Sequence, residues 1–291
     1  MTFRLTRFVA AAALAAASLL TGSLAQAAGG EYPLDHFPQD KLNNLPSLQR
    51  GAQLFVNYCL GCHSANYMRY NRLADIGLTD DLIKENLLFT GTKVGDQMRI
   101  AMSPKDAKEW LGAAPPDLSV IARARSSGAG SGSDWLYTFL RSYYRDDSKA
   151  TGWNNALFPN VGMPHVLWTL QGQRGAETLE PSHHGEGHGD GPAEAIKTTY
   201  DNTGAASQET VTPAPGVMLH KKQFTFGSPV QGSMNSFEYD EAVGDLVAYL
   251  TYMSDPTAKT RNRLGVWVLL FISIFFVVAW MLNKAFWKDI K

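Results

Sequence analysis

Two cysteines and the histidine beside them are the residues best suited to do chemistry in this chain. Cys59 and Cys62 are the only cysteines among 291 residues, and His63 follows directly in the segment VNYCLGCH. A pair with this spacing could be a redox dithiol, half of a zinc site or the anchor of a c-type haem. No second pair exists to complete a four-cysteine zinc site. A thioredoxin-type dithiol would require a strand next to the motif, and the flanking sequence is not strand-like.

The C-x-x-C-H spacing meets the demands of a covalently attached haem. Two thiols two residues apart can add to the two vinyl groups at one edge of the porphyrin, and the adjacent histidine then falls beneath the iron as an imidazole ligand. The motif predicts one haem c per chain, held through two thioethers by Cys59 and Cys62 and ligated by His63.

Two amphipathic helices are predicted to position this motif. Apolar residues recur at three- and four-residue spacing over 47–59, with Ser47 as the expected cap and Gly51 marking the close approach of another element. A second stripe lies in the segment 239–253 and contains Val243, Leu246, Val247 and Leu250. Pairing of a first and a last helix is the architecture of the mono-haem cytochrome c family, which this part of the chain resembles.

The first residues predict export. Residues 1–27 combine Arg4 and Arg7, an alanine-rich apolar run and the small-residue site Ala25-Gln26-Ala27. This pattern is typical of a cleaved secretory signal, which would deliver the following domain, 28–263, to an oxidising compartment.

The last residues predict a membrane anchor. Residues 264–282 carry no charge and, at about 1.5 Å per residue, would span roughly 28 Å, close to the hydrocarbon thickness of a bilayer. Basic residues flank the segment on both sides, so the positive-inside rule does not choose an orientation. The predicted signal sets the orientation instead, because it would place 28–263 outside and leave 283–291 as a short cytoplasmic tail.

Charge and composition limit the kinds of partner and the structure expected of the remaining segments. The net charge is −1, and nothing in the chain favours binding to nucleic acid. Residues 171–216 are rich in Gly, Ser, Thr and Pro and are interpreted as a flexible excursion from the core. Within it, the His- and Gly-rich stretch 181–192 could bind a metal ion or form a mobile surface loop.

Three further segments resemble the cytochrome c1 family. They are GAAPPDLSVIARAR (112–125), LFPNVGMP (157–164) and YDEAVGDLVAYLTYMSDP (239–256), the last followed by the single anchor. The resemblance covers most of 40–290. It implies a mainly α fold, namely a cytochrome c-like mono-haem domain with loop insertions and one C-terminal transmembrane helix.

The resemblance also implies a set of haem-binding residues. By spacing alone, any of six methionines could be the second axial ligand of the iron: Met98, Met102, Met163, Met218, Met234 and Met253. The match of VGMP to the family's ligand loop selects Met163, so that His63 and Met163 are the expected metal ligands. Arg125 is expected to meet a haem propionate, Pro115 and Pro116 to form a rigid rim against the haem face, and Trp135 to pack on the haem.

The function implied by the resemblance is electron transfer in the respiratory cytochrome bc1 complex. The haem would accept an electron from the Rieske iron–sulfur protein and pass it to a soluble or membrane-bound cytochrome c, with no bond chemistry by this chain alone. Cytochrome b would be a second partner, in a dimeric complex of the bacterial inner membrane with the haem domain on the periplasmic side. Two alternatives stay open: a haem enzyme or gas-binding sensor with an open iron position, and a thiol–disulfide or haem-handling protein.

Overall fold

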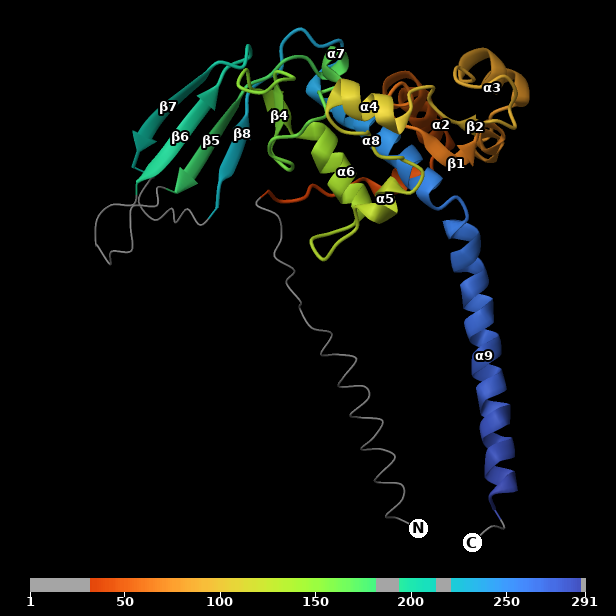
Figure 1. The fold of residues 1–291 in the computed structure, drawn as a ribbon. Coiled ribbons are helices and arrows are strands. Elements are labelled where there is room, and N and C mark those ends of the chain that lie inside the picture. The colour runs from red at the N-terminus through yellow and green to blue at the C-terminus, as the bar shows by residue number, and fades with distance from the viewer. Residues whose placement is uncertain (1–31, 182–193, 213–220, 289–291) are drawn as a thin grey trace.

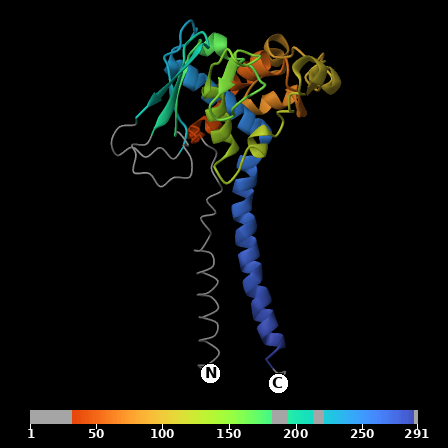
Figure 2. The same ribbon diagram turned by 60° about the vertical axis from the view of Figure 1, so that its left-hand side comes forward.

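The computed structural model describes residues 32–181, 194–212 and 221–288 (Figure 1). The predicted signal, 1–27, and all but the first residue of the His- and Gly-rich stretch 181–192 lie outside the described residues. The remaining chain forms a mainly helical head, a small sheet on one flank of the head, and one long helix that extends away from it (Figures 1 and 2). The predicted mainly α architecture is confirmed.

The two predicted helices form and pack together in the head. Helix α2 (Leu45–Leu54) continues into a π-helical turn, η2 (Phe55–Cys59), and packs against α8 (Ser236–Ser254). The stripe expected on the second helix is buried throughout, at Val243, Leu246, Val247 and Leu250. The predicted cap was wrong. Asn44 caps the first helix by accepting a hydrogen bond from Ser47 N at 3.3 Å, because Pro46 fits the first turn and the helix therefore begins earlier.

The crossing of α2 and α8 depends on Gly51. A Cβ atom at this position would lie 2.0 Å from the carbonyl oxygen of Asp245, so only a glycine allows the two backbones to approach this closely. The side chain of Asp245 is buried at the same crossing, where it binds Lys41 Nζ at 2.8 Å and Arg50 Nε at 2.6 Å. The crossing is therefore held by backbone contact on one side and by a buried ionic cluster on the other.

Short elements surround this helix pair. The further helices of the head are η1 (Gln39–Asn43), η3 (Tyr70–Ile76), α3 (Asp80–Asn86), α4 (Pro104–Leu111), α5 (Ile121–Ala124), α6 (Gly132–Arg141) and α7 (Trp168–Gln171). Two antiparallel pairs accompany them: β1 (Ala65–Arg69) with β2 (Gln97–Met98), and β3 (Tyr143–Arg145) with β4 (Trp153–Asn155). Both α6 and the short α5 pack against α8, which makes α8 the central element of the head.

An antiparallel sheet lies in and just after the region interpreted as a flexible excursion, 171–216. Its strands are β5 (Ala176–Pro181), β6 (Ala195–Tyr200), β7 (Ala206–Val211) and β8 (Gln223–Phe226), in the order β7-β6-β5-β8. The sheet is fixed to the head by aromatic contacts, since Tyr144 packs against Tyr200 and Phe224 at ring-centroid distances of 5.1 and 6.0 Å. Composition did not reveal these strands, because their Thr, Gln and Glu residues resemble those of loops.

The predicted anchor lies in α9 (Ala258–Phe286). The helix is long and apolar enough to cross a membrane. Its most apolar 18-residue stretch has a mean hydropathy of 2.6, and none of that stretch is buried in the protein. Asp255 lies at its junction with α8, where its carboxylate binds Arg123 of α5 at 3.2 Å and Arg261 of α9 at 2.6 Å. This ionic cluster ties the anchor to the head.

Replacing Gly51 with alanine is expected to destabilise the fold. An alanine is intrinsically favoured over glycine in a helix by about 1 kcal/mol, but its Cβ would overlap a backbone oxygen that cannot move independently, and overpacking costs about 1–3 kcal/mol or more. Thermal unfolding of the full chain in detergent should show a lowered Tm. Gly95→Ala is the matched control, because a Cβ there meets nothing within 4 Å. Equal stability of the two variants would contradict the crossing described here.

Asp255→Asn is expected to lower stability at neutral pH by about 1 kcal/mol or less, since both arginines that bind it are more than half exposed. The hydrogen bond from Arg261 lowers the pKa of Asp255 below its ordinary value of 3.8. A depressed carboxyl pKa stabilises the fold above the unfolded-state pKa, and this contribution is lost as the pH falls through the folded-state pKa. The difference in Tm between the two proteins should therefore be constant near pH 7 and shrink below pH 3.8. A difference that grows on acidification would show that another group is responsible.

Candidate haem-binding site

The C-x-x-C-H motif forms a tight turn at the end of the first helix. The carbonyl oxygen of Cys59 accepts hydrogen bonds from Cys62 N at 3.1 Å and from His63 N at 2.9 Å. The π-helical turn that precedes it is a distortion often found at functional sites. Cys59 is buried and Cys62 is exposed, so the two thiols lie at different depths along one turn.

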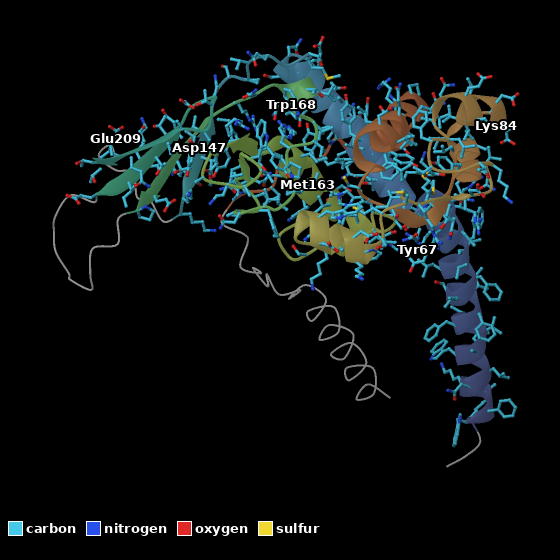
Figure 3. The ribbon with its side chains drawn as sticks, turned by 45° about the horizontal axis from the view of Figure 1, so that its top comes forward. Tyr67, Lys84, Asp147, Met163, Trp168 and Glu209 are labelled. Carbon is cyan, nitrogen blue, oxygen red and sulfur yellow. The ribbon has the colours of Figure 1, made fainter. Side chains whose placement is uncertain are left out.

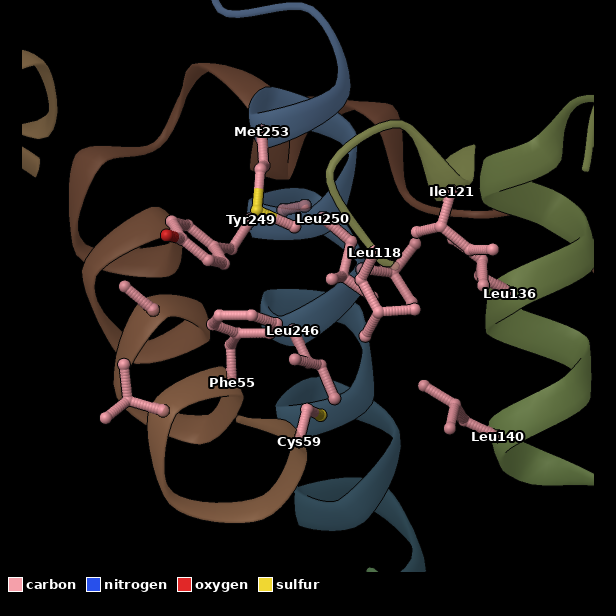
Figure 4. Close-up of a cluster of buried hydrophobic side chains, with 14 of the residues drawn as sticks. Phe55, Cys59, Leu118, Ile121, Leu136, Leu140, Leu246, Tyr249, Leu250 and Met253 are labelled. Atoms are coloured by element: carbon pink, nitrogen blue, oxygen red, sulfur yellow. The ribbon is translucent and has the colours of Figure 1, made fainter. Parts of the chain in front are cut away.

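Apolar side chains from several segments converge beside Cys59 (Figure 4). They belong to one buried cluster and come from the segment after Pro116, from α6 and from α8: Leu118, Ile121, Leu136, Leu140, Leu246 and Leu250. An apolar wall of this kind suits a flat porphyrin, because it excludes water from the faces of the ring. None of these six aliphatic residues was predicted from the sequence to contact a haem.

His63 is oriented by a backbone carbonyl. Its Nδ1 lies 2.7 Å from the carbonyl oxygen of Pro116, which can only accept, so Nδ1 carries the proton and Nε2 is left with a free lone pair. Burial lowers the pKa of His63, against the opposing effects of Pro116 and Asp117. The ring is therefore neutral at neutral pH, which is the form that binds a metal. Pro116, expected only as part of a rim, thus supplies the group that fixes the imidazole tautomer.

Asp117 fastens this proline segment beside the motif, a role that the sequence analysis missed. Its carboxylate accepts hydrogen bonds from Asn66 N at 2.8 Å, Asn66 Nδ2 at 2.7 Å and Ser119 N at 2.8 Å. Burial would raise the pKa of Asp117, but these hydrogen bonds lower it and keep the carboxylate charged. An aspartate that bonds the amide two residues later is a recognisable turn signal. Its partner Asn66, however, is distant in the sequence.

Met163 lies in the loop between β4 and α7 (Figure 3). It is half-buried against the cluster that contains Cys59. Its carbonyl oxygen accepts a hydrogen bond from the Tyr143 hydroxyl at 3.2 Å. Among the other candidate methionines, Met98 is buried and its sulfur accepts a hydrogen bond from Tyr249 at 3.7 Å, while Met218 lies outside the described residues. The structure thus places Met163 in a loop against the core and gives Met98 a packing role.

His165 follows in the same loop and was not singled out by the sequence analysis. It is buried among aromatic rings, and its Nε2 lies 2.7 Å from Gln171 Oε1. Burial lowers the pKa of His165 to about 3, so the ring is neutral and donates to the amide oxygen. Its burial inside the loop makes it a packing residue and leaves Met163 as the potential ligand of this loop.

Arg125 and Trp135 form a pair. The Arg125 guanidinium lies 4.3 Å from the centroid of the Trp135 ring, which in turn stacks on Phe139 at 4.9 Å. Within the described ranges Arg125 forms no ion pair, so its guanidinium could still take a carboxylate. The two residues singled out separately in the sequence are thus in contact.

The alternatives for the cysteine pair gain no support. No group of three or more His, Cys, Asp or Glu residues that could hold a metal ion occurs within 32–181, 194–212 and 221–288. Burial raises the pKa of the Cys59 thiol to about 12, whereas redox-active dithiols depend on a lowered pKa. The apolar wall, the oriented imidazole and the half-buried methionine fit a covalently bound haem.

Comparison with known proteins leads to the same family. A cytochrome b/c1 of Bradyrhizobium diazoefficiens is 26% identical, over 97% of this chain and 40% of that protein. A protein of Nitrosomonas europaea named ammonia monooxygenase gamma subunit is 41% identical over 94% of this chain and 96% of its own length. The cytochrome c1 of Allochromatium vinosum is 41% identical over 95% of this chain and 98% of its own length.

The model of the cytochrome c1 family matches residues 38–174 and 228–290. The matched ranges include the haem motif, the proline segment, the Met163 loop and the anchor. The unmatched residues between them contain all four strands of the β5–β8 sheet. The chain belongs to the cytochrome c1 family.

Proposed function

We propose that this chain is the haem c subunit of a cytochrome bc1 complex, which accepts one electron from the Rieske iron–sulfur protein and passes it to a cytochrome c. Membership of the family supports electron transfer within such a complex. The observation that carries the proposal for this site is the hydrogen bond from His63 Nδ1 to the Pro116 carbonyl, because it leaves the Nε2 lone pair free to bind an iron.

Each residue of the site has a role in holding the cofactor. Cys59 and Cys62 would form the two thioethers, and His63 and Met163 would bind the iron. A haem supplies one-electron transfer at its iron, and a histidine–methionine ligand set favours the reduced state. The proline segment and the apolar wall would exclude water from the cofactor, and Trp135 would pack against it.

Arg125 is proposed to bind a haem propionate. A guanidinium is planar and can bind a carboxylate through two parallel hydrogen bonds, and its contact with the Trp135 ring at 4.3 Å holds it beside the site. The absence of an ion-paired carboxylate within the described part of the chain leaves its hydrogen-bond donors free for this contact.

The membrane helix determines where the electron transfer occurs. Helix α9 would hold the haem domain at the membrane that contains the quinol pool, in a bacterial inner membrane with the head on the periplasmic side. The relative named cytochrome b/c1 supports cytochrome b as a partner, since its name joins both cytochromes. We further propose that the complex is dimeric and that this subunit performs no bond chemistry alone.

Replacing Met163 with leucine tests the proposal. Loss of the sulfur ligand should lower the midpoint potential by more than about 0.1 V, within the roughly 0.8 V range that axial ligands control. It should also open the iron to carbon monoxide in the reduced protein. Both are measured on the purified haem-loaded chain, by redox titration and by optical difference spectra.

Met234→Leu is the matched control, because Met234 is also half-buried against the core. The control should retain the native potential. An unchanged potential in Met163→Leu would exclude Met163 as the ligand. Carbon monoxide binding by the unsubstituted protein would instead favour a haem enzyme or gas sensor with an open iron position.

A further inference from the structure

We infer that Tyr143 is a positioning residue for the Met163 loop, and that Arg174 connects this tyrosine to the β5–β8 sheet. The inference rests on the proposed function, in which Met163 is an iron ligand. It assigns a structural purpose to a sheet that lies outside the matched part of the family.

Tyr143 contacts the ligand loop twice. Its side chain is fully buried, and its hydroxyl donates a hydrogen bond to the carbonyl oxygen of Met163 at 3.2 Å. Its ring stacks on His165, two residues further along the same loop, with centroids 4.7 Å apart and an interplanar angle of 9°. One side chain therefore contacts the loop at the expected ligand and just beyond it.

The loop is held on its other side by the surroundings of His165. This ring packs edge-on against Trp153 at 4.9 Å and bonds Gln171 of α7 through Nε2. Tyr143 and Trp153 belong to the paired strands β3 and β4, so this hairpin and α7 together enclose His165. The backbone of Met163 is therefore constrained before any ligand bond forms.

Arg174 fixes the backbone of Tyr143. Its Nε donates to the Tyr143 carbonyl oxygen at 2.9 Å, and its Nη2 donates to the carbonyl oxygen of Arg141. Neither acceptor is an acid, and across the described part of the chain Arg174 has no carboxylate in an ion pair. The nearby acids Asp35 and Asp240 both bind Arg141 instead. A charged side chain is thus used to hold two carbonyl groups at the end of α6 and the start of β3.

The sheet covers this arginine. The Arg174 guanidinium lies 4.0 Å from the centroid of the Phe226 ring in β8, the strand at the edge of the sheet nearest the head. A continuous set of contacts therefore runs from Phe226 through Arg174 and Tyr143 to Met163. A loop restrained in this way loses less freedom when its sulfur binds iron, which favours the internal ligand over a competing external one.

The test is competition by imidazole for the iron in the ferric, haem-loaded full chain. Imidazole displaces the methionine, and the displacement is followed by loss of the weak long-wavelength band of a sulfur–iron bond. Tyr143→Phe removes only the hydroxyl. Its imidazole affinity should rise about two- to tenfold, because a typical hydrogen bond contributes 0.5–1.5 kcal/mol.

Tyr144→Phe is the matched control. Tyr144 is adjacent and similarly buried, but its ring packs on Tyr200 and Phe224 of the sheet and not on the ligand loop. Its imidazole affinity should equal that of the unsubstituted protein. A purely structural effect of losing a buried hydroxyl would change both variants alike, and that result would overturn the inference.

Arg174→Lys tests the connection to the sheet. It also provides a second test of the inference if Tyr143→Phe does not fold. A lysine keeps the charge but cannot bond two carbonyl groups in the fixed geometry of a guanidinium. Its imidazole affinity should also rise, and its effect should be less than additive with that of Tyr143→Phe, because both act on one contact. Full additivity, or no effect, would show that Arg174 does not act through Tyr143.

The same titration separates this inference from the proposed function. If the unsubstituted protein binds imidazole as readily as Met163→Leu does, Met163 is not a ligand and the proposed function fails first. If the unsubstituted protein and Tyr143→Phe resist imidazole equally, the ligand assignment stands and only the positioning role is wrong.

Discussion

The contact between Gly51 and the Asp245 carbonyl is the constraint on which the rest of the structure depends. It allows α2 and α8 to cross at backbone distance, and the turn that carries Cys59 and His63 is the direct continuation of α2. Helix α8 also carries α5, α6 and, through Asp255, the membrane helix. A displacement at this crossing would therefore move the haem motif, its apolar wall and the anchor relative to one another.

Around this crossing, the proposed haem ligands are oriented mainly by backbone groups. The Pro116 carbonyl fixes the proton of His63, and the Cys59 carbonyl closes the turn of the motif. Met163 is restrained through its own carbonyl by Tyr143. Such groups suit an electron carrier, because they fix ligand geometry and do not titrate near neutral pH. A site that changes little between oxidation states exchanges electrons with little rearrangement.

The β5–β8 sheet lies outside the residues that the cytochrome c1 family model matches. Its aromatic face packs against Tyr144, and Phe226 covers the arginine that holds the neighbouring Tyr143. This part of the chain, distant in sequence from the haem motif, is thus connected to the Met163 loop through Arg174 and Tyr143. On the inference drawn above, the sheet stabilises that loop.

The amino-acid sequence was enough to predict the haem motif, the two central helices and the membrane helix, because each depends on the residues of one segment. It also indicated the family, because three separate segments resemble it. The C-x-x-C-H motif requires only adjacent residues, the apolar stripe of α8 follows from the helical period, and the membrane helix α9 follows from its length and hydropathy. Only the folded structure shows which nitrogen of His63 carries the proton and that Asp117 accepts hydrogen bonds from Asn66. The same is true of the contact of Arg125 with Trp135 and of the hydrogen bond from Tyr143 to the Met163 loop. Each of these joins residues distant in sequence, and a carbonyl acceptor such as that of Pro116 has no side-chain signature. The sheet escaped detection for a related reason: its polar strands are stabilised by backbone pairing and by packing on the head, neither of which the composition of the segment records.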